Sequence, residues 1–139
     1  MLDIPVEITK ASSLEVRRDH TVASHVEGMP EVFATPMMIY LMETVAGDLI
    51  APYLPEGWIS VGVHVDVKHL AATPLGATVT ATAKITAVTD NMVTFEVEAH
   101  DEAERVGEGT HVRAAVELSR FLKRLDRKTS RIAGGDSQR

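Results

Sequence analysis

The chain has 139 residues, of which 45% are hydrophobic and 24% charged, and its formal net charge is −6 at pH 7. This composition predicts one soluble domain with a single core. The acidic balance argues against a general nucleic-acid surface, because phosphate contacts need clustered Lys and Arg. The chain has no cysteine, which excludes disulfides, thiolate metal sites and a cysteine nucleophile.

No targeting or membrane-spanning segment is expected. The first residues, Met-Leu-Asp-Ile-Pro-Val-Glu, have no basic start followed by an apolar core, so we expect no signal peptide. The longest apolar stretch is interrupted by Glu43 and Asp48, so we expect no membrane span. We therefore expect a cytoplasmic location.

The first third of the chain predicts little regular structure. Residues 4–9 and 12–18 alternate weakly and allow one or two short strands. Residues 19–34 are expected to be irregular, since Gly28 and Pro30 interrupt them.

A long helix is predicted from Thr35 to near Tyr53. Thr is a good helix cap, and Pro36 stands where the first helical position favours proline. The cluster of Pro52, Pro55 and Gly57 predicts the end of the helix. The stretch is apolar on nearly every side, which is typical of a helix surrounded by protein.

Four strands are predicted after the helix. The first follows Trp58 and ends before Ala72, and the others cover residues 77–88, 92–99 and 106–118. In the first strand, Val61, Val63, Val65 and Val67 are expected on the buried face together with His69, and Gly62 on the other face. In the last strand, we expect Val112 and Ala114 on the apolar face and Arg113 opposite to them.

Short connections between the later strands imply antiparallel neighbours. The predicted fold is therefore of the α+β class, with one long central helix wrapped by a curved antiparallel sheet. We expect a single domain over residues 1–126 and a flexible polar tail over residues 127–139. The basic residues between Arg120 and Lys128 are interpreted as the polar face of a closing helix, although contact with an anionic ligand stays open.

Glu43 is the first candidate for a functional residue. A carboxylate inside an apolar helix costs free energy unless it is paired, hydrogen-bonded or used in chemistry. Glu43 is therefore either a buried polar anchor or the acid of an active site. Thr35 lies eight residues earlier, about 12 Å along the helix axis, and acts either as a helix cap or as part of the same site.

His69 is the second candidate, because strand parity places its imidazole on the buried face, near the helix. The alternative is a strand end that turns His69 to solvent. The histidines do not form a converging set of ligands, so we expect no metal site. There is no glycine-rich phosphate loop and no serine in a nucleophile elbow.

Several segments together resemble a known family. They are Pro30-Glu-Val-Phe-Ala-Thr35, Leu41-Met-Glu43, Ala51-Pro-Tyr-Leu54, Lys68-His-Leu-Ala-Ala-Thr-Pro74, Gly107-Glu-Gly-Thr-His111 and Arg113-Ala114. Their order and spacing, over roughly residues 15–122, are similar to those of hotdog-fold thioesterases of the fluoroacetyl-CoA thioesterase type. The hotdog fold of that family is a long helix wrapped by an antiparallel sheet.

The resemblance implies an acyl-CoA thioesterase that hydrolyses a short or small acyl thioester to a carboxylate and free CoA. By position, Thr35, Glu43 and His69 match the catalytic residues of the family. Gly62 matches a backbone amide donor near the acyl group, and Arg113 matches an arginine at the acyl pocket. The family implies a homodimer with acyl-CoA sites between subunits, no metal, and no cofactor besides the CoA of the substrate; pairing of dimers into a tetramer stays open.

Two departures from the family pattern leave the acyl group open. The fluoroacetyl enzyme covers its pocket with phenylalanines, whereas residues 25–29 here contain no aromatic side chain. Pro36 has no N–H to offer an oxyanion. Two other functions also stay open, a non-catalytic acyl-CoA or small-ligand binder and an enoyl-CoA hydratase or dehydratase.

Overall fold

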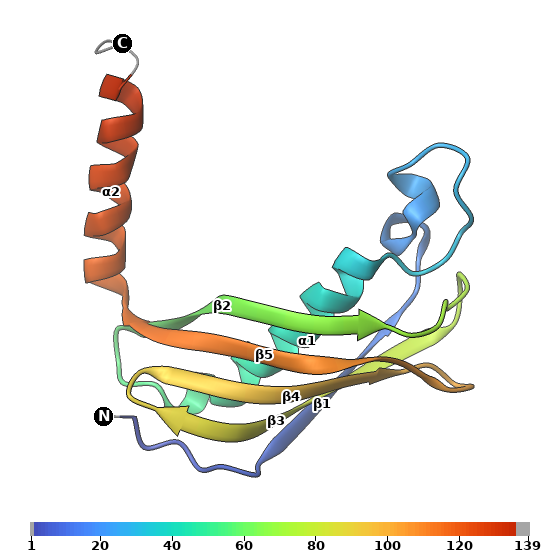
Figure 1. The fold of residues 1–139 in the computed structure, drawn as a ribbon, viewed down its shortest axis with the longest axis horizontal. Helices are drawn as coiled ribbons and strands as arrows, with labels where there is room; N and C mark the ends of the chain where they lie inside the picture. Colours follow the sequence, from blue (N-terminus) through green and yellow to red (C-terminus); the bar gives the residue numbers. More distant parts are fainter. Residues whose placement is uncertain (1, 136–139) are drawn as a thin grey trace.

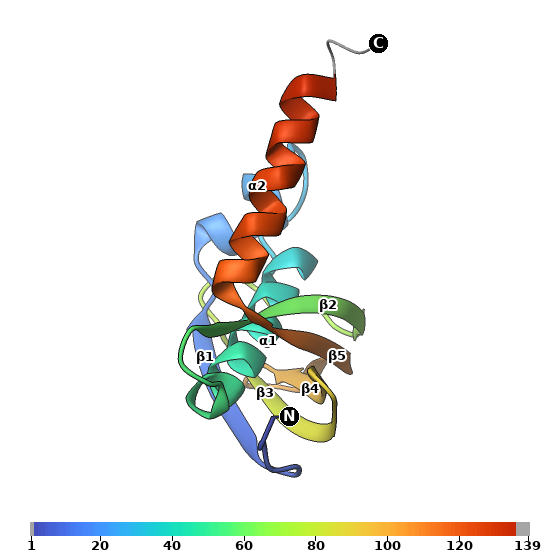
Figure 2. The ribbon, with the colours of Figure 1, turned by 90° about the vertical axis from the view of Figure 1, so that its left-hand side faces the viewer.

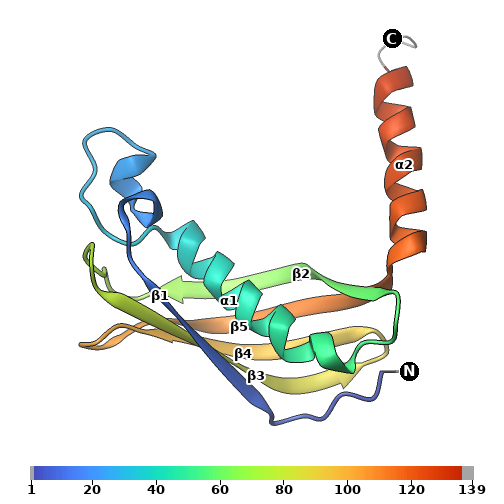
Figure 3. The same cartoon turned by 180° about the vertical axis from the view of Figure 1, so that it is seen from behind.

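A single long helix lies across one face of a five-stranded antiparallel sheet in the computed structural model, which describes residues 2–135 (Figures 1 and 3). The predicted α+β class, with a long helix against an antiparallel sheet, is confirmed. The order of the strands is β1-β3-β4-β5-β2, so β1 and β2 form the two edges. The elements are β1 (Thr9–Glu15), α1 (Thr35–Ile50), β2 (Trp58–His69), β3 (Thr78–Thr89), β4 (Met92–His100), β5 (Arg105–Glu117) and α2 (Leu118–Gly135).

The helix α1 begins where it is predicted to begin. Ala34 has extended backbone angles and precedes the first turn, which contains Pro36. The α-helix ends at Ile50, and a short 3₁₀ turn over Ala51–Tyr53 follows, because Pro52 cannot continue the α-helical hydrogen bonds. The predicted end near Tyr53 therefore describes the helix together with this turn.

The core lies between α1 and the face of the sheet that the helix covers. Met38, Val45 and Ile50 of α1 are fully buried, and they belong to the same cluster as Phe95 and Val97 of β4. Close approach of α1 to β5 depends on Gly107, because a Cβ atom at this position would collide with the Met38 sulfur.

We expect the Gly107→Ala variant to be destabilised by about 1–3 kcal/mol, the usual cost of adding a methyl group to a packed core. The side chain of Met38 is buried and has little room to move away. Urea unfolding measures the free energy of unfolding. Gly47→Ala is the matched control, since its added Cβ would only touch the Arg113 guanidinium at 3.4 Å and alanine favours a helix over glycine. Equal stabilities of Gly107→Ala and the wild type would contradict this account of the packing.

The predicted alternation of β2 is confirmed for Val65, Val67 and His69 but is wrong for Val61 and Gly62, because the strand contains a bulge. The register against β5 shifts between Gly62 and His64, so Val63 is an extra residue. Directly paired residues of antiparallel strands point to the same face. Gly62 pairs with Arg113 and His69 pairs with Gly107, both of which face the helix. The bulge therefore places Gly62 and His69 on the same face, although they are an odd number of residues apart.

The predicted faces of β5 are also wrong, by one residue. β5 pairs with β4, and Phe95 and Val97, which are buried against the helix, lie opposite His111 and Gly109. His111 and Arg113 therefore face α1, whereas Val112 lies on the other face. The sequence suggested the opposite assignment of faces because Val112, Ala114 and Val116 are all apolar. Small or buried side chains lie on both faces of this strand, so alternation alone does not identify the face that packs on α1.

The helix α2 leaves the sheet at the end of β5 and projects away from it (Figures 1 and 2). It runs without a break from Leu118 to Gly135. Residues 127–135, which we expected to belong to a polar tail, are therefore part of the helix. Residues 136–139 of the expected tail lie outside the described part, and the domain boundary stays a prediction. Among residues 2–135, no helix is long and apolar enough to span a membrane.

Candidate active site

Thr35 and His69 meet where the start of α1 lies beside the end of β2. The Thr35 Oγ1 and the His69 Nδ1 are 2.7 Å apart, which is a hydrogen bond. The hydroxyl makes no capping bond to the start of the helix. The interpretation of Thr35 as a helix cap is therefore wrong, and its hydroxyl is directed to the imidazole instead.

The other nitrogen of His69 has no protein partner. The Nε2 is buried and makes no hydrogen bond within residues 2–135. Burial lowers the pKa of His69 below its usual value, so the ring is neutral at pH 7. A neutral imidazole offers one donor and one acceptor, and it accepts a proton from a hydroxyl or from water.

The lowered pKa of His69 predicts the acid limb of the pH profile. If the neutral ring is the active form, activity falls only when the pH drops through the lowered pKa. We therefore expect the acid limb of the kcat/KM profile, which reports the free enzyme, to lie below pH 6.5, the ordinary value for histidine. NMR titration of the His69 ring measures the same pKa independently. An acid limb that His69 controls at or above pH 6.5 would contradict this expectation.

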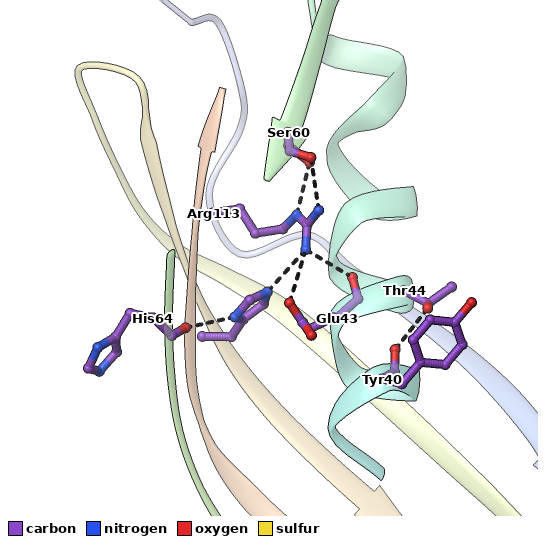
Figure 4. A network of polar contacts seen from close by, with 7 residues as sticks. Tyr40, Glu43, Thr44, Ser60, His64 and Arg113 are labelled. Atoms are coloured by element: carbon purple, nitrogen blue, oxygen red, sulfur yellow. Dashed lines mark hydrogen bonds and ion pairs between the residues drawn. The ribbon is translucent and has the colours of Figure 1, made fainter. Parts of the chain in front are cut away.

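Glu43 lies two helical turns from Thr35, on the side of α1 that faces Gly62 and Arg113 (Figure 4). Its side chain is 37% exposed, and the Oε2 lies 3.9 Å from the Arg113 Nη1. A Cβ atom at position 62 would collide with this oxygen, so glycine leaves the space that the carboxylate occupies. Glu43 is thus half-buried and held next to a cation, with one side open to a ligand.

Arg113 is anchored more firmly than Glu43. Its Nε donates to the Ser60 Oγ at 2.9 Å, and its Nη2 donates to the Ser60 carbonyl at 3.0 Å (Figure 4). Its Nη1 donates to the backbone carbonyl of Glu43 at 3.4 Å. The guanidinium therefore joins β5, β2 and α1, and its position does not depend on the Glu43 carboxylate.

His111 also belongs to this cluster, and the sequence did not identify it. It is 1% exposed and stacks on Phe95 with ring centroids 5.9 Å apart. Its Nδ1 donates to the His64 carbonyl at 2.8 Å, and its Nε2 accepts from the Arg113 Nη1 at 3.3 Å. Burial lowers the pKa of His111, in agreement with a neutral ring between two fixed partners. The signal that could have identified His111 is its spacing of two residues from Arg113, because residues two apart on a strand point to the same face.

The five predicted site residues all lie between α1 and the sheet, but they form two groups. One group is Thr35 with His69, and the other is Glu43 with Gly62 and Arg113. Among residues 2–135, no hydrogen bond or ion pair joins the two groups. Part of this space is open to solvent, because the Glu43 side chain is 37% exposed.

Two other features do not contribute to this arrangement. A cavity of about 290 Å³ lies elsewhere in the fold, and its lining includes Leu2, Pro55 and Trp58. In the described part of the chain, no group of three or more His, Cys, Asp or Glu side chains is placed to hold a metal ion.

Comparison with known proteins identifies relatives that share this fold. The model of the family FlK, fluoroacetyl-CoA-specific thioesterase, matches residues 16–119. A fluoroacetyl-CoA thioesterase of Streptantibioticus cattleyicolor is 44% identical over 100 residues, which are 72% of each chain. A solved structure of the fluoroacetyl-CoA thioesterase FlK has a TM-score of 0.85 at 36% identity, and the match covers 90% of this chain and 97% of that one. A thioesterase superfamily member of Thermus thermophilus has a TM-score of 0.89 at 26% identity, covering 96% and 99%.

The fold and these relatives define the class of the protein, a thioester hydrolase of the hotdog fold. More narrowly, the chain belongs to the fluoroacetyl-CoA-specific thioesterase family. The predicted fold, the predicted family and the predicted activity of an acyl-CoA thioesterase are thereby confirmed.

Proposed function

We propose that this chain hydrolyses a short or small acyl thioester of coenzyme A at the site between α1 and β2, with Thr35, Glu43 and His69 as catalytic residues. The observation that carries the proposal is the 2.7 Å hydrogen bond between the Thr35 hydroxyl and a neutral imidazole whose second nitrogen is buried and has no partner in the described chain. A hydroxyl–imidazole pair of this kind orients or activates an oxygen nucleophile.

Thioester hydrolysis needs an oxygen nucleophile and a stabilised oxyanion more than a strong acid, because a thiolate is a good leaving group. In one route, Glu43 removes a proton from water, and the water oxygen attacks the carbonyl carbon. The C–S bond then breaks, and His69 accepts the second proton of the attacking water and passes it to the departing thiolate. In a second route, the Glu43 carboxylate attacks the carbonyl carbon and the C–S bond breaks to release the thiolate, which leaves a mixed anhydride. Water then hydrolyses the anhydride to the carboxylic acid and free Glu43. Thr35 positions the thioester through its hydroxyl or is itself the nucleophile.

The two remaining residues bind the acyl group in this proposal. Gly62 supplies a backbone N–H near the thioester carbonyl, since Pro36 at the start of the helix has none. Arg113 stabilises negative charge next to Glu43, and its bonds to Ser60 hold it in place.

The proposal includes a homodimer, a cytoplasmic location, and no metal or cofactor besides the CoA of the substrate. A dimer is favoured by the free edge of β2, where Val63 and Val65 are 49% and 40% exposed. Light scattering of the purified protein should give twice the mass of one chain, or four times if dimers pair. A monomeric protein that is fully active would contradict this part of the proposal.

The activity is tested with a panel of acyl-CoAs, including acetyl-, propionyl-, butyryl- and fluoroacetyl-CoA, and free thiol is measured. Fluoroacetyl-CoA is one member among several because residues 25–29 are exposed and contain no aromatic side chain. At least one thioester should release thiol with multiple turnovers. Stable binding of an intact thioester would indicate a binding protein instead, and loss of ultraviolet absorbance from an enoyl-CoA without thiol release would indicate a hydratase.

The two chemical routes are separated by a single turnover in ¹⁸O-labelled water. If water attacks the thioester directly, the label appears only in the carboxylic acid. If Glu43 is the nucleophile, part of the label enters the side chain of Glu43, and mass spectrometry of the peptide that contains this residue detects it. Hydrolysis of an ester on Thr35 returns the threonine with its own oxygen, so a threonine route would instead be detected as an acyl adduct on Thr35 after rapid acid quenching.

A further inference from the structure

The helix α2 projects beyond the edge of the sheet that β2 forms (Figures 1 and 3). Its 18 residues correspond to a length of about 27 Å. It carries a stripe of apolar side chains that are largely exposed: Leu118 at 38%, Leu122 at 51%, Leu125 at 50% and Ile132 at 65%. A long helix with an uncovered apolar stripe needs a partner surface.

The charge of α2 is opposite to that of the rest of the chain. The helix has one acidic residue, Asp126, although the whole chain has a net charge of −6. Its basic residues are Arg120, Lys123, Arg124, Arg127, Lys128 and Arg131. Among these side chains, those in the outer half of the helix are exposed. The remainder of the protein is therefore strongly acidic, and a second copy offers α2 a surface of complementary charge.

Within one chain, α2 is far from the proposed active site. It follows Glu117, which pairs with Trp58 at the start of β2, whereas His69 ends the same strand. The 11 residues of extended strand between these positions correspond to about 36 Å. The helix therefore begins at the opposite end of the sheet from the Thr35–His69 pair.

Two-fold symmetry changes this relation. If two copies join through their free β2 edges, the two identical strands must run antiparallel. The start of one β2 then lies beside the end of the other. Because α2 begins beside the start of β2 and projects past that edge, it reaches the end of the partner that holds the partner's Thr35–His69 pair.

Resting on the proposed acyl-CoA hydrolysis, we propose that α2 of each subunit packs on the second subunit and binds the phosphates of the CoA at that subunit's site. The apolar stripe contacts the partner, and the basic face meets the diphosphate and the 3′-phosphate of CoA. Lys and Arg form charge-assisted bonds with phosphate oxygens. Seven Lys and Arg residues precede α2, and five of them are already ion-paired with Glu side chains, namely Arg17, Arg18, Lys84, Arg105 and Arg113.

The first test replaces four basic residues in the outer half of the helix, giving the variant Arg124→Gln, Arg127→Gln, Lys128→Gln and Arg131→Gln. The KM for an acyl-CoA should rise by at least about tenfold with kcat unchanged, because several charge-assisted contacts to phosphate are lost. The KM for the matching acyl-pantetheine, which lacks these phosphates, should not change. The control is Lys10→Gln with Arg17→Gln, which removes exposed charges from the body and should leave both KM values unchanged.

The second test asks whether α2 acts on its own subunit or on the partner. Mixed dimers are prepared from a subunit with the four substitutions and a His69→Ala subunit with an unchanged helix. The only intact Thr35–His69 pair then belongs to the subunit whose own helix is neutralised. We expect the low KM of the wild type, because the intact site receives its helix from the His69→Ala subunit. A KM as high as that of the neutralised homodimer would overturn the proposal.

The outcomes also separate this proposal from the proposed activity. If no thioester is hydrolysed, calorimetric titration with CoA and with pantetheine still measures whether the four substitutions weaken binding of the phosphate-bearing ligand alone. Equal losses for acyl-CoA and acyl-pantetheine would overturn the role in phosphate binding. Unchanged CoA affinity, combined with helix-dependent sedimentation on vesicles of anionic phospholipid, would assign α2 to a membrane surface instead.

Discussion

The Glu43→Gln variant is expected to lose about 10²–10⁴-fold in kcat while it folds like the wild type. Glutamine keeps the size of the side chain but neither removes a proton from water nor attacks a carbonyl. Little stability is at risk, because Arg113 lies 3.9 Å from the carboxylate and keeps its hydrogen bonds to Ser60. Thiol release measures the activity, and thermal unfolding measures the stability.

Asp48→Asn is the matched control for this variant. Asp48 lies on the same helix, five residues later, and its side chain is exposed. Its charge acts on Arg113 less than that of Glu43 and without a contact, so kcat should stay within about twofold of the wild type when the charge is removed. If Glu43→Gln kept most of the wild-type kcat, Glu43 would be a structural anchor, the interpretation that its sequence context leaves open.

The Gly62→Ala variant is expected to lose activity with little change in stability. The added methyl group would collide with the Glu43 Oε2, and the carboxylate is able to turn toward solvent because its side chain is 37% exposed. The methyl group would also lie 3.3 Å from the His111 Cε1, so this ring has to shift by only a few tenths of an ångström. Displacement of a catalytic group by about 1 Å costs on the order of 10²-fold in rate. The measurement is kcat for an acyl-CoA, with the melting temperature as the check on folding.

A double-mutant cycle shows whether Gly62→Ala acts through Glu43. If it does, adding Gly62→Ala to Glu43→Gln should reduce kcat far less than it does in the wild-type background, since the displaced group is already inactive. Additive losses would mean that the methyl group blocks the substrate or disturbs the amide of residue 62, and the proposed relation between these two residues would be wrong.

The secondary structure was largely predictable because it depends on local patterns. Prolines and a run of apolar residues mark α1, and alternating side chains mark the four long strands. The structure has one strand, β1, in the region where one or two short strands were predicted. The helix α2 was predicted only as a short closing helix, because its polar residues 127–131 resemble a tail and nothing local shows how far the helix continues.

The faces of β2 and β5 were not predictable from alternation alone. Val63 fits the apolar pattern of β2, so the bulge at this residue leaves no sign in composition. In β5, Val112 and Ala114 are apolar but lie opposite to the helix, and this phase is set by pairing with β4. Long-range pairing therefore decided which side chains enter the site, and this is why His111 was missed.

The roles of the candidate residues depended on geometry in a similar way. A threonine before a proline is fully explained as a helix cap, and only the 2.7 Å bond to His69 shows that its hydroxyl is used elsewhere. Glu43 was expected to be buried, but it is half-buried and borders the free edge of β2.

The extra residue in β2 also limits how this enzyme can vary in length. Deletion of Val63 would restore a regular strand, and the residues on one side of the deletion would then turn to the opposite face. Either the glycine beside the carboxylate or the imidazole beside the hydroxyl would leave the reaction space, even though no catalytic residue had been replaced. A relative that lacks one residue here should therefore carry a compensating insertion before its histidine, or catalyse its reaction with a different set of groups.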